Sequence, residues 1–236
     1  MNISDISQSD TVKADKPTKK KIKKKKIIII TLIAILTVAA VWFTCYGIYC
    51  LKMYNRYVKP FISNEHLSLD SDSEDGKMYT HFSDDLTYVF SATVGIFPYS
   101  NNKGFFSAQL LDGEGYDESD NRITDHTLNL TYSLQFDGTV YYDVYITEYG
   151  SGEKKDRSRC SQIWFTPDME YVEGYCIDDI EGKDYKNTDE VKEVFEKYKN
   201  EIKKHLEMLW DFFGKENFKS QDKIVRLMKD GENESI

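Results

Sequence analysis

The chain has 236 residues, of which 31 are basic and 40 are acidic, so its formal net charge is −9 at pH 7. The charge is divided along the chain, because residues 1–59 carry 12 basic and three acidic residues (net +9), whereas residues 60–236 carry 19 basic and 37 acidic ones (net −18). The strongly acidic residues 60–236 repel anionic polymers such as nucleic acids. The basic first 26 residues contain no aromatic side chain on which a base could stack. We therefore expect no nucleic-acid partner.

Residues 1–26 are expected to form a disordered, lysine-rich cytoplasmic tail. Nine lysines lie between Lys13 and Lys26, directly before an apolar run. Lysines in such a position are attracted to the anionic lipids of the inner leaflet by about 1 kcal/mol each. We expect the lysines nearest to the apolar run to contact these lipids, namely Lys23, Lys24, Lys25 and Lys26.

Residues 27–50 are predicted to be a transmembrane anchor. The 23 residues from 27 to 49 contain no charge, and an α-helix of that length rises roughly 34 Å, enough to cross a hydrocarbon core of about 30 Å. Basic residues are more frequent on the cytoplasmic side of a span. Nine lysines precede this run, and only Lys52, Arg56 and Lys59 follow it closely. The pattern predicts a single-pass protein of the cell membrane with a cytoplasmic N-terminus and an extracytoplasmic C-terminal domain.

The apolar run does not have the form of a removed signal peptide. A secretory signal has about 7–15 apolar residues and then small residues at its cleavage site. Here Ala39 and Ala40 are followed by bulky residues, namely Val41, Trp42 and Phe43. The run is therefore expected to stay in the protein as a signal-anchor.

Residues 51–86 are predicted to form a juxtamembrane stalk, because the sequence after residue 62 is poor in apolar residues. Its acidic stretch 70–76 begins like a calcium-binding EF-hand loop. Such a loop needs glycine at its sixth position and glutamate at its twelfth, which are Asp75 and His81 here. No metal site is expected.

Residues 87–236 are predicted to be an extracytoplasmic domain that begins with an antiparallel β-meander. Alternation of apolar and polar residues predicts strands, and it is found over residues 87–96, 104–111, 127–136 and 139–149. The last two strands are joined at Asp137-Gly138. A two-residue loop would put their apolar residues on opposite faces, so we expect a three-residue loop or a bulge, which puts them on one face.

Cys160 and Cys176 lie outside the predicted span, near the ends of a predicted hairpin whose turn is at residues 167–169. A hairpin centred on residue 168 places the two cysteines directly opposite each other, within reach of a disulfide. Because disulfides persist in oxidising compartments, we predict a bond between Cys160 and Cys176. The alternative is two reduced and buried thiols.

A long amphipathic helix is predicted to follow, capped by Asn187 or Thr188 and ending at Gly214. Apolar residues recur at steps of three and four over residues 191–213, and this stripe is expected to cover one face of the sheet. A shorter helix is predicted over residues 220–229. The predicted fold class is therefore α+β: a single N-terminal transmembrane helix, then an antiparallel β-meander sheet covered on one face by a long C-terminal helix.

The polar face of the hairpin at residues 127–149 is the candidate contact surface. If the even-numbered apolar residues point inward, the odd-numbered residues point outward, and we select Tyr141, Asp143, Tyr145 and Tyr149 as candidate ligand or partner contacts. A tyrosine ring is apolar in its body and polar at its tip, so it can stack on a sugar or line a protein interface. The alternatives are ordinary strand residues on a solvated face and a further layer that covers this face.

The sequence contains no motif for catalysis or cofactor binding. It has no Gly-rich phosphate loop after a strand, and no His-x-x-x-His, Cys-x-x-Cys or Gly-x-Ser-x-Gly pattern. We expect neither a cofactor nor a catalytic residue. The leading hypothesis is a membrane-anchored, non-catalytic binding domain whose partner is an envelope glycan or a membrane protein. The alternatives are an envelope enzyme that acts on wall glycan or peptide through carboxylates, and a membrane sensor or regulator.

Overall fold

The computed structural model describes residues 19–73, 76–84, 86–95, 105–113, 124–135, 138–152 and 157–219. The chain divides into two compact units, Met1–Leu51 and Lys52–Ile236. The shorter helix predicted over residues 220–229 lies outside the described residues.

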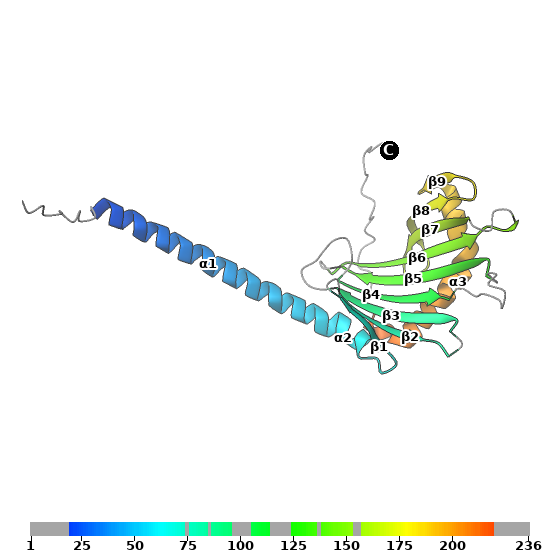
Figure 1. The fold of residues 1–236 in the computed structure, drawn as a ribbon, viewed down its shortest axis with the longest axis horizontal. Coiled ribbons are helices and arrows are strands. Elements are labelled where there is room, and N and C mark those ends of the chain that lie inside the picture. Colours follow the sequence, from blue (N-terminus) through cyan, green and yellow to red (C-terminus); the bar gives the residue numbers. More distant parts are fainter. Residues whose placement is uncertain are drawn as a thin grey trace, which may run out of the picture. The chain divides into compact units, whose positions relative to one another are not determined.

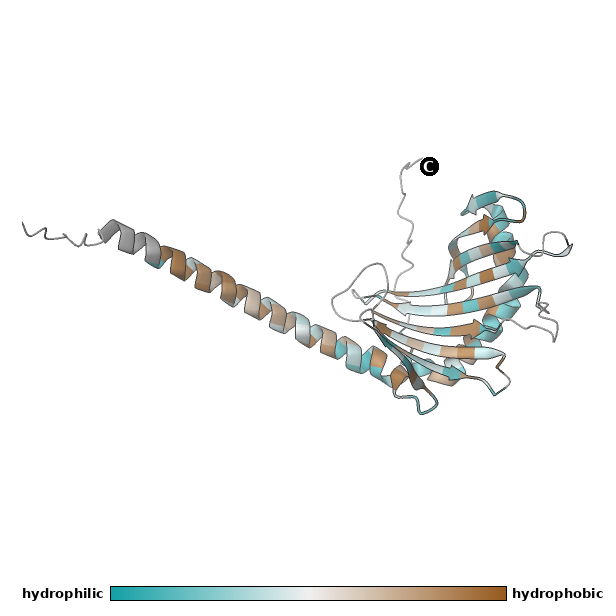
Figure 2. Cartoon of the chain, in the orientation of Figure 1, coloured by the Kyte–Doolittle hydropathy of each residue, from teal (hydrophilic) through white to brown (hydrophobic). Residues whose placement is uncertain are grey.

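The described part of the first unit belongs to one helix, α1 (Lys19–Met53). The helical segment Lys26–Ile62 is long and apolar enough to cross a membrane, and Figure 2 shows its apolar stretch in brown. The hydroxyls of Thr31, Thr37 and Thr44 donate to the carbonyl oxygens four residues earlier, at 2.8–3.0 Å. These bonds satisfy polar groups where a lipid environment would offer no partner. The helix begins within the lysine run, so part of the expected tail is helical.

The second unit is built on a nine-stranded antiparallel sheet (Figure 1). The strands lie in chain order, and each one pairs with the next. Their bounds are β1 (Ser68–Ser73), β2 (Gly76–Phe82), β3 (Tyr88–Gly95), β4 (Phe106–Asp112), β5 (His126–Leu134), β6 (Val140–Tyr149), β7 (Ser158–Phe165), β8 (Tyr171–Asp178) and β9 (Lys183–Lys186). The meander is confirmed, and together with the helices on either side of it the fold class is α+β.

β1 and β2 lie within the expected stalk at residues 51–86. β1 pairs with β2, and β2 pairs with β3 along its whole length. The sheet therefore begins at residue 68, and the segment that was expected to be a stalk contributes two strands.

The hairpin of β5 and β6 has the predicted three-residue loop. Leu134 pairs with Val140, and the backbone N–H of Gln135 donates to the carbonyl oxygen of Thr139 at 2.7 Å. Gly138 has a φ of 86°, the left-handed conformation that the last position of such a loop requires. The even-numbered residues of both strands therefore point to one face, as predicted.

α3 (Asp189–Phe213) covers that face and crosses behind the strands in the view of Figure 1. It begins after Thr188 and ends at Gly214, as predicted. The predicted stripe is buried along the whole helix, and it consists of Val191, Val194, Phe195, Tyr198, Ile202, His205, Leu206, Leu209 and Phe213. α3 is therefore the second layer of the domain.

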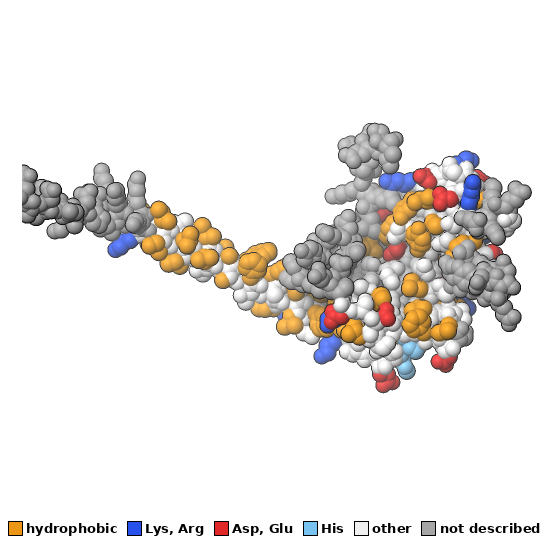
Figure 3. Space-filling model, in the orientation of Figure 1, with side chains coloured by type: hydrophobic (Ala, Val, Ile, Leu, Met, Phe, Trp, Pro, Cys, Tyr) orange, Lys and Arg blue, Asp and Glu red, His pale blue; other side chains and the backbone are white. Residues whose placement is uncertain are grey.

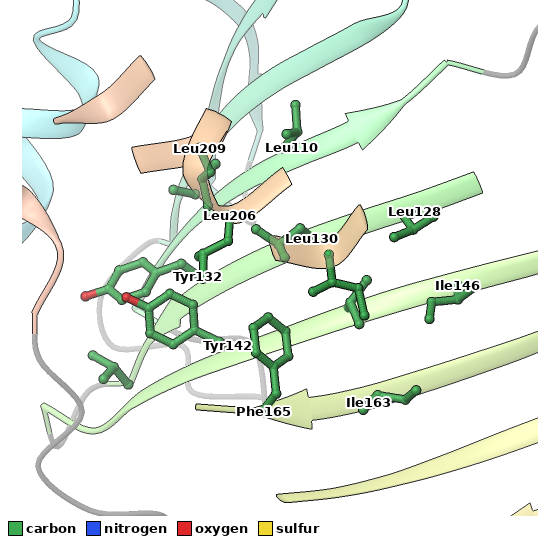
Figure 4. Close-up of a cluster of buried hydrophobic side chains, with 14 of the residues drawn as sticks. Leu110, Leu128, Leu130, Tyr132, Tyr142, Ile146, Ile163, Phe165, Leu206 and Leu209 are labelled. Carbon is green, nitrogen blue, oxygen red and sulfur yellow. The ribbon is translucent and has the colours of Figure 1, made fainter. Parts of the chain in front are cut away.

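The core lies between α3 and the sheet. Figure 4 shows Leu206 and Leu209 of α3 beside buried side chains of the central strands. The fully buried aliphatic residues of those strands that are larger than alanine are Leu110, Leu128, Leu130, Leu134, Val144, Ile146 and Ile163. Full burial of one such side chain contributes about 1.5–3 kcal/mol, so this layer is the main source of stability.

A second part of the core comes from the segment that follows α1. A π-helical turn, η1 (Tyr54–Val58), leads into the short helix α2 (Lys59–Ile62). Phe61 of α2 is fully buried. Its ring lies 4.7 Å from that of Phe106, 4.9 Å from Phe218 and 5.3 Å from Phe213, measured between ring centroids. The beginning of the second unit is thus packed into the domain.

The predicted disulfide is absent, because Cys160 and Cys176 are both free. Cys160 pairs with Ile177, and Cys176 pairs with Ser161. Since neighbouring residues of a strand point to opposite faces, the two thiols lie on opposite sides of the sheet and cannot meet.

The cause is a one-residue bulge in β8. Phe165 pairs with Tyr171, as a turn centred on residue 168 predicts, but Trp164 then pairs with Glu173. Val172 is therefore an additional residue between two consecutive pairs. A shift of one residue changes the face of every later side chain relative to the partner strand, which overturns the cysteine prediction.

Candidate functional site

The face of the sheet opposite α3 carries the four predicted contact residues. Tyr141 pairs with Ser133, Asp143 with Thr131, and Tyr145 with Asn129, all on β5; Tyr149 pairs with Ser158 of β7. All four side chains are partly exposed. In Figure 3, hydrophobic side chains form separate orange patches on the visible face of the domain, with a few charged side chains between them.

A hydrogen-bonded row crosses three strands at the middle of this face. Tyr145 of β6 pairs with Gln162 of β7, which pairs with Tyr175 of β8. The hydroxyl of Tyr175 donates to Oε1 of Gln162 at 2.9 Å, and Nε2 of Gln162 donates to a carboxylate oxygen of Asp143 at 3.0 Å. The Gln162 amide is thereby held in one orientation. The Gln162 amide and the Asp143 carboxylate both keep further hydrogen-bonding capacity.

Trp164 lies in the next row, between Asp143 of β6 and Glu173 of β8. The Trp164 and Tyr175 rings have centroids 6.1 Å apart and planes inclined at 39°. Together, Tyr145, Trp164 and Tyr175 surround the Asp143–Gln162 pair. We call these five residues the aromatic surface.

The electrostatics of the aromatic surface are set by partial burial. Burial raises the pKa of Asp143 to about 6, against the opposing effect of the Gln162 hydrogen bond. Burial and then the neighbouring Cys160 thiol raise the pKa of Tyr145 to about 12. Burial also raises the pKa of Tyr175. At neutral pH the surface therefore offers neutral phenols and an indole around one carboxylate.

Two of the predicted contacts lie outside the aromatic surface. Tyr141 and Tyr149 are each four positions from Tyr145 along β6, towards opposite ends of the strand. The Tyr149 hydroxyl lies 3.3 Å from Oγ1 of Thr127. The structure thus brings Asp143 and Tyr145 together with residues of β7 and β8, rather than with the other two tyrosines.

Sequence reasoning missed Trp164, Gln162 and Tyr175. The signal for the first two is the alternation in β7, where Ser161, Ile163 and Phe165 point inward and the residues between them point outward. No such signal places Tyr175, because its face depends on the bulge at Val172.

Lys26, one of the expected lipid-contacting lysines, is exposed at the start of the apolar segment. Lys23, Lys24 and Lys25 belong to α1, but their side chains lie outside the described part of the structure. Within the described ranges, no group of three or more His, Cys, Asp and Glu side chains is placed to hold a metal ion.

A comparison of the chain with known protein families, with curated proteins and with solved structures finds no match.

Proposed function

We propose that this chain is a single-pass membrane protein with a cytoplasmic N-terminal tail, and that its extracytoplasmic domain binds an envelope glycan without catalysing a reaction. The observation that carries the proposal is the aromatic surface: three aromatic side chains around a carboxylate and an amide that are held by hydrogen bonds. The anchor is supported by one helical segment long and apolar enough to cross a membrane.

The chemistry of the aromatic surface suits a sugar. Aromatic faces pack against the apolar C–H groups of sugar rings, and the same side chains carry polar groups at their edges. The carboxylate of Asp143 accepts hydrogen bonds from hydroxyls, and the amide of Gln162 both donates and accepts. Both groups lie among the rings, so a bound sugar would satisfy hydrogen bonds and apolar contacts at one place.

The orientation in the membrane is supported by charge. The lysines before the apolar run outnumber the basic residues that follow it closely, and such a bias places the N-terminal side in the cytoplasm. In this arrangement the lysines from Lys23 to Lys26 contact anionic lipids of the inner leaflet.

Binding is tested by titrating the detergent-solubilised full chain with soluble wall-glycan fragments in a calorimeter. Trp164→Ala and Tyr145→Ala should each weaken binding at least tenfold, because aromatic contacts dominate such sites. Phe82→Ala is the matched control, since Phe82 is an exposed aromatic residue on β2, far along the sheet. An unchanged affinity in both surface variants would overturn the proposal.

The same experiment separates a binding protein from the envelope enzyme. A binding protein leaves the glycan fragments intact during long incubation, which mass spectrometry reports. Product formation that is lost in Asp143→Asn would instead favour catalysis through carboxylates. A folded chain that binds no glycan would direct the search towards a membrane-protein partner.

Topology is tested with a membrane-impermeant maleimide on intact cells that express single-cysteine variants. Glu207→Cys, at an exposed position of α3, should be labelled from outside. Ser9→Cys should be labelled only after the membrane is permeabilised. The reverse pattern would contradict the proposed orientation.

A further inference from the structure

Asp143 is the one charged residue of the aromatic surface, and it lies directly beside an indole. It pairs with Trp164 across β6 and β7, and side chains at opposite positions of neighbouring strands have Cβ atoms about 4.5–5.5 Å apart. Tyr145 lies two positions along β6 from Asp143, so it is on the same face. A group bound at the carboxylate is therefore within reach of two aromatic rings.

The Asp143 carboxylate has no cationic partner in the described part of the structure. Nε2 of Gln162 donates to Oδ2 of Asp143 at 3.0 Å. Among the described residues, Oδ1 accepts no hydrogen bond, and no basic side chain forms an ion pair with Asp143. Because an ionised carboxylate has about four acceptor sites, most of its capacity is available to a ligand.

The pKa values on this surface agree with a carboxylate that lacks a counter-ion. Burial raises the pKa of Asp143 to about 6, whereas a nearby cation would lower it. Burial and then the charge of Asp143 raise the pKa of Tyr175, so this charge also acts on the Tyr175 phenol. At pH 7 Asp143 is a partly buried negative charge, which a bound cation would stabilise.

The charged neighbours of the aromatic surface do not neutralise Asp143. Glu173, opposite Trp164 on β8, has the same sign, and it is 3% exposed and therefore not accessible to a ligand. Lys186 pairs with Tyr175, and it lies on β9, three strands from Asp143. At about 4.8 Å per strand this is roughly 14 Å, more than the Debye length of about 8 Å at physiological ionic strength.

We propose that the aromatic surface selects a glycan that carries a free amino group, such as a hexosamine unit without its acetyl group. The ammonium group is bound between the Asp143 carboxylate and the faces of Tyr145 and Trp164. A cation within about 6 Å of a ring centroid is attracted to the face of the ring, and the carboxylate supplies the opposite charge. This inference rests on the proposed glycan binding and adds to it the charge of the sugar.

The test compares an N-acetylglucosamine oligomer with the same oligomer after removal of one acetyl group. A single amine limits non-specific attraction to the acidic domain. Each probe is titrated into the detergent-solubilised full chain near pH 7, with calorimetry as the readout. We expect the amine form to bind about tenfold more tightly, the combined effect of a partly exposed ion pair and a cation–π contact. Equal affinities would overturn this inference and leave glycan binding intact, whereas no binding of either form would overturn the proposed glycan binding itself.

A charge-removing variant then places the amine at Asp143. Asp143→Asn should bind both forms equally, with the affinity that the wild type has for the acetylated form. Asp184→Asn is the matched control, because Asp184 is exposed on the same face of the sheet, on β9, and this variant should keep the full preference. A preference that persists in Asp143→Asn, or an equal loss in Asp184→Asn, would contradict the assignment.

A second variant tests the aromatic part of the contact. Trp164→Leu keeps an apolar side chain and removes the indole face. The ratio of the two affinities should therefore fall about threefold, apart from any loss of affinity that both forms share. An unchanged ratio would show that the ammonium group does not lie over the Trp164 ring.

Discussion

Nε2 of His205 on α3 lies 2.6 Å from a carboxylate oxygen of Asp112 on β4. Nδ1 of the same ring lies 2.9 Å from the carbonyl oxygen of Glu201. Since a carbonyl accepts and an ionised carboxylate accepts, both ring nitrogens donate when His205 is protonated. This buried pair joins the helix to the sheet within the apolar stripe of α3.

The first prediction is a pH-dependent loss of this contact. Burial alone would lower the pKa of His205, but the hydrogen bond and charge of Asp112 outweigh burial and raise it. A raised pKa means that the folded state binds the proton more tightly than the unfolded state. The contribution of the His205–Asp112 pair to stability is therefore complete below the unfolded-state pKa of about 6.5, and it is lost as pH rises through the folded-state pKa. His205→Leu should reduce the free energy of unfolding by about 3 kcal/mol at pH 6, because it leaves a buried charge without its partner.

Urea unfolding of the wild type and of His205→Leu between pH 5 and 9 measures this effect. The difference between the two curves should shrink above pH 6.5, and taking the difference removes contributions from other titrating groups. Lys204→Leu, at the exposed neighbouring position, should leave the pH profile unchanged. A difference that stays constant over this range would mean that folding does not shift the pKa of His205, and it would overturn this prediction.

The second prediction concerns Asp143, whose pKa is raised to about 6 by burial. Because the carboxyl pKa is raised, ionisation of Asp143 destabilises the folded state. Stability should therefore fall as pH rises from the unfolded-state pKa of about 3.9 to the folded-state pKa of about 6. Asp143→Asn keeps an acceptor for Gln162 and removes the charge. It should match the wild type near pH 4 and be more stable above pH 6, and parallel curves over that interval would refute the expectation.

The third prediction concerns Phe61, which is buried among aromatic side chains although it precedes the sheet. Phe61→Ala should lower the free energy of unfolding by about 3–5 kcal/mol, because it removes a large buried ring and leaves a cavity. Phe82→Ala, at a residue that is 54% exposed, should change it by less than about 0.5 kcal/mol. Chemical denaturation monitored by near-ultraviolet circular dichroism distinguishes the two variants.

The fourth prediction uses cysteine chemistry to read the register of β6, β7 and β8. Thr147 pairs with Cys160, and Oγ1 of Thr147 lies 4.0 Å from its Sγ. Thr147→Cys in a Cys176→Ser background should therefore form an intramolecular disulfide under mild oxidation. The unmodified chain should keep Cys160 and Cys176 as thiols, which mass spectrometry after alkylation shows. A Cys160–Cys176 bond in monomeric, folded protein would mean that β8 has no bulge at Val172.

The parts of the fold that could be predicted are those with strict periodicity. β5 and β6 alternate without interruption, and the stripe of α3 runs from Val191 to Phe213. In these elements the apolar residues all face one core, so the pattern in the sequence and the burial in the structure have the same cause. The three-residue loop followed from requiring both apolar sets to lie on one face.

β1 and β2 were not predicted, for a physical reason. β1 is an edge strand whose described side chains are exposed, so no apolar residues alternate along it. Exposed acidic residues at a sheet edge protect it from pairing with other chains, and Asp70 and Asp72 fit that role. In sequence, such a strand cannot be told from a polar linker.

The candidate site was predicted in part. Asp143 and Tyr145 follow from the alternation of β6, but their aromatic neighbours come from two other strands. The position of Tyr175 depends on the additional residue Val172, and nothing in the local sequence requires a bulge there. The disulfide prediction was wrong for the same reason, since it assumed an unbroken register.

The order of the elements has a consequence for biosynthesis. All nine strands precede α3 in the chain, so a ribosome completes the whole sheet before it makes the long helix whose buried stripe covers the apolar face. At about 5–20 residues per second, the 25 residues of α3 take at least a second or so. During that time Leu128, Leu130 and Ile146 have no partner helix. A nascent chain that stalls before residue 189 would thus expose a broad, aggregation-prone hydrophobic surface. The protein therefore depends on timely completion of its synthesis, or on a chaperone, more than a fold whose helices are made first.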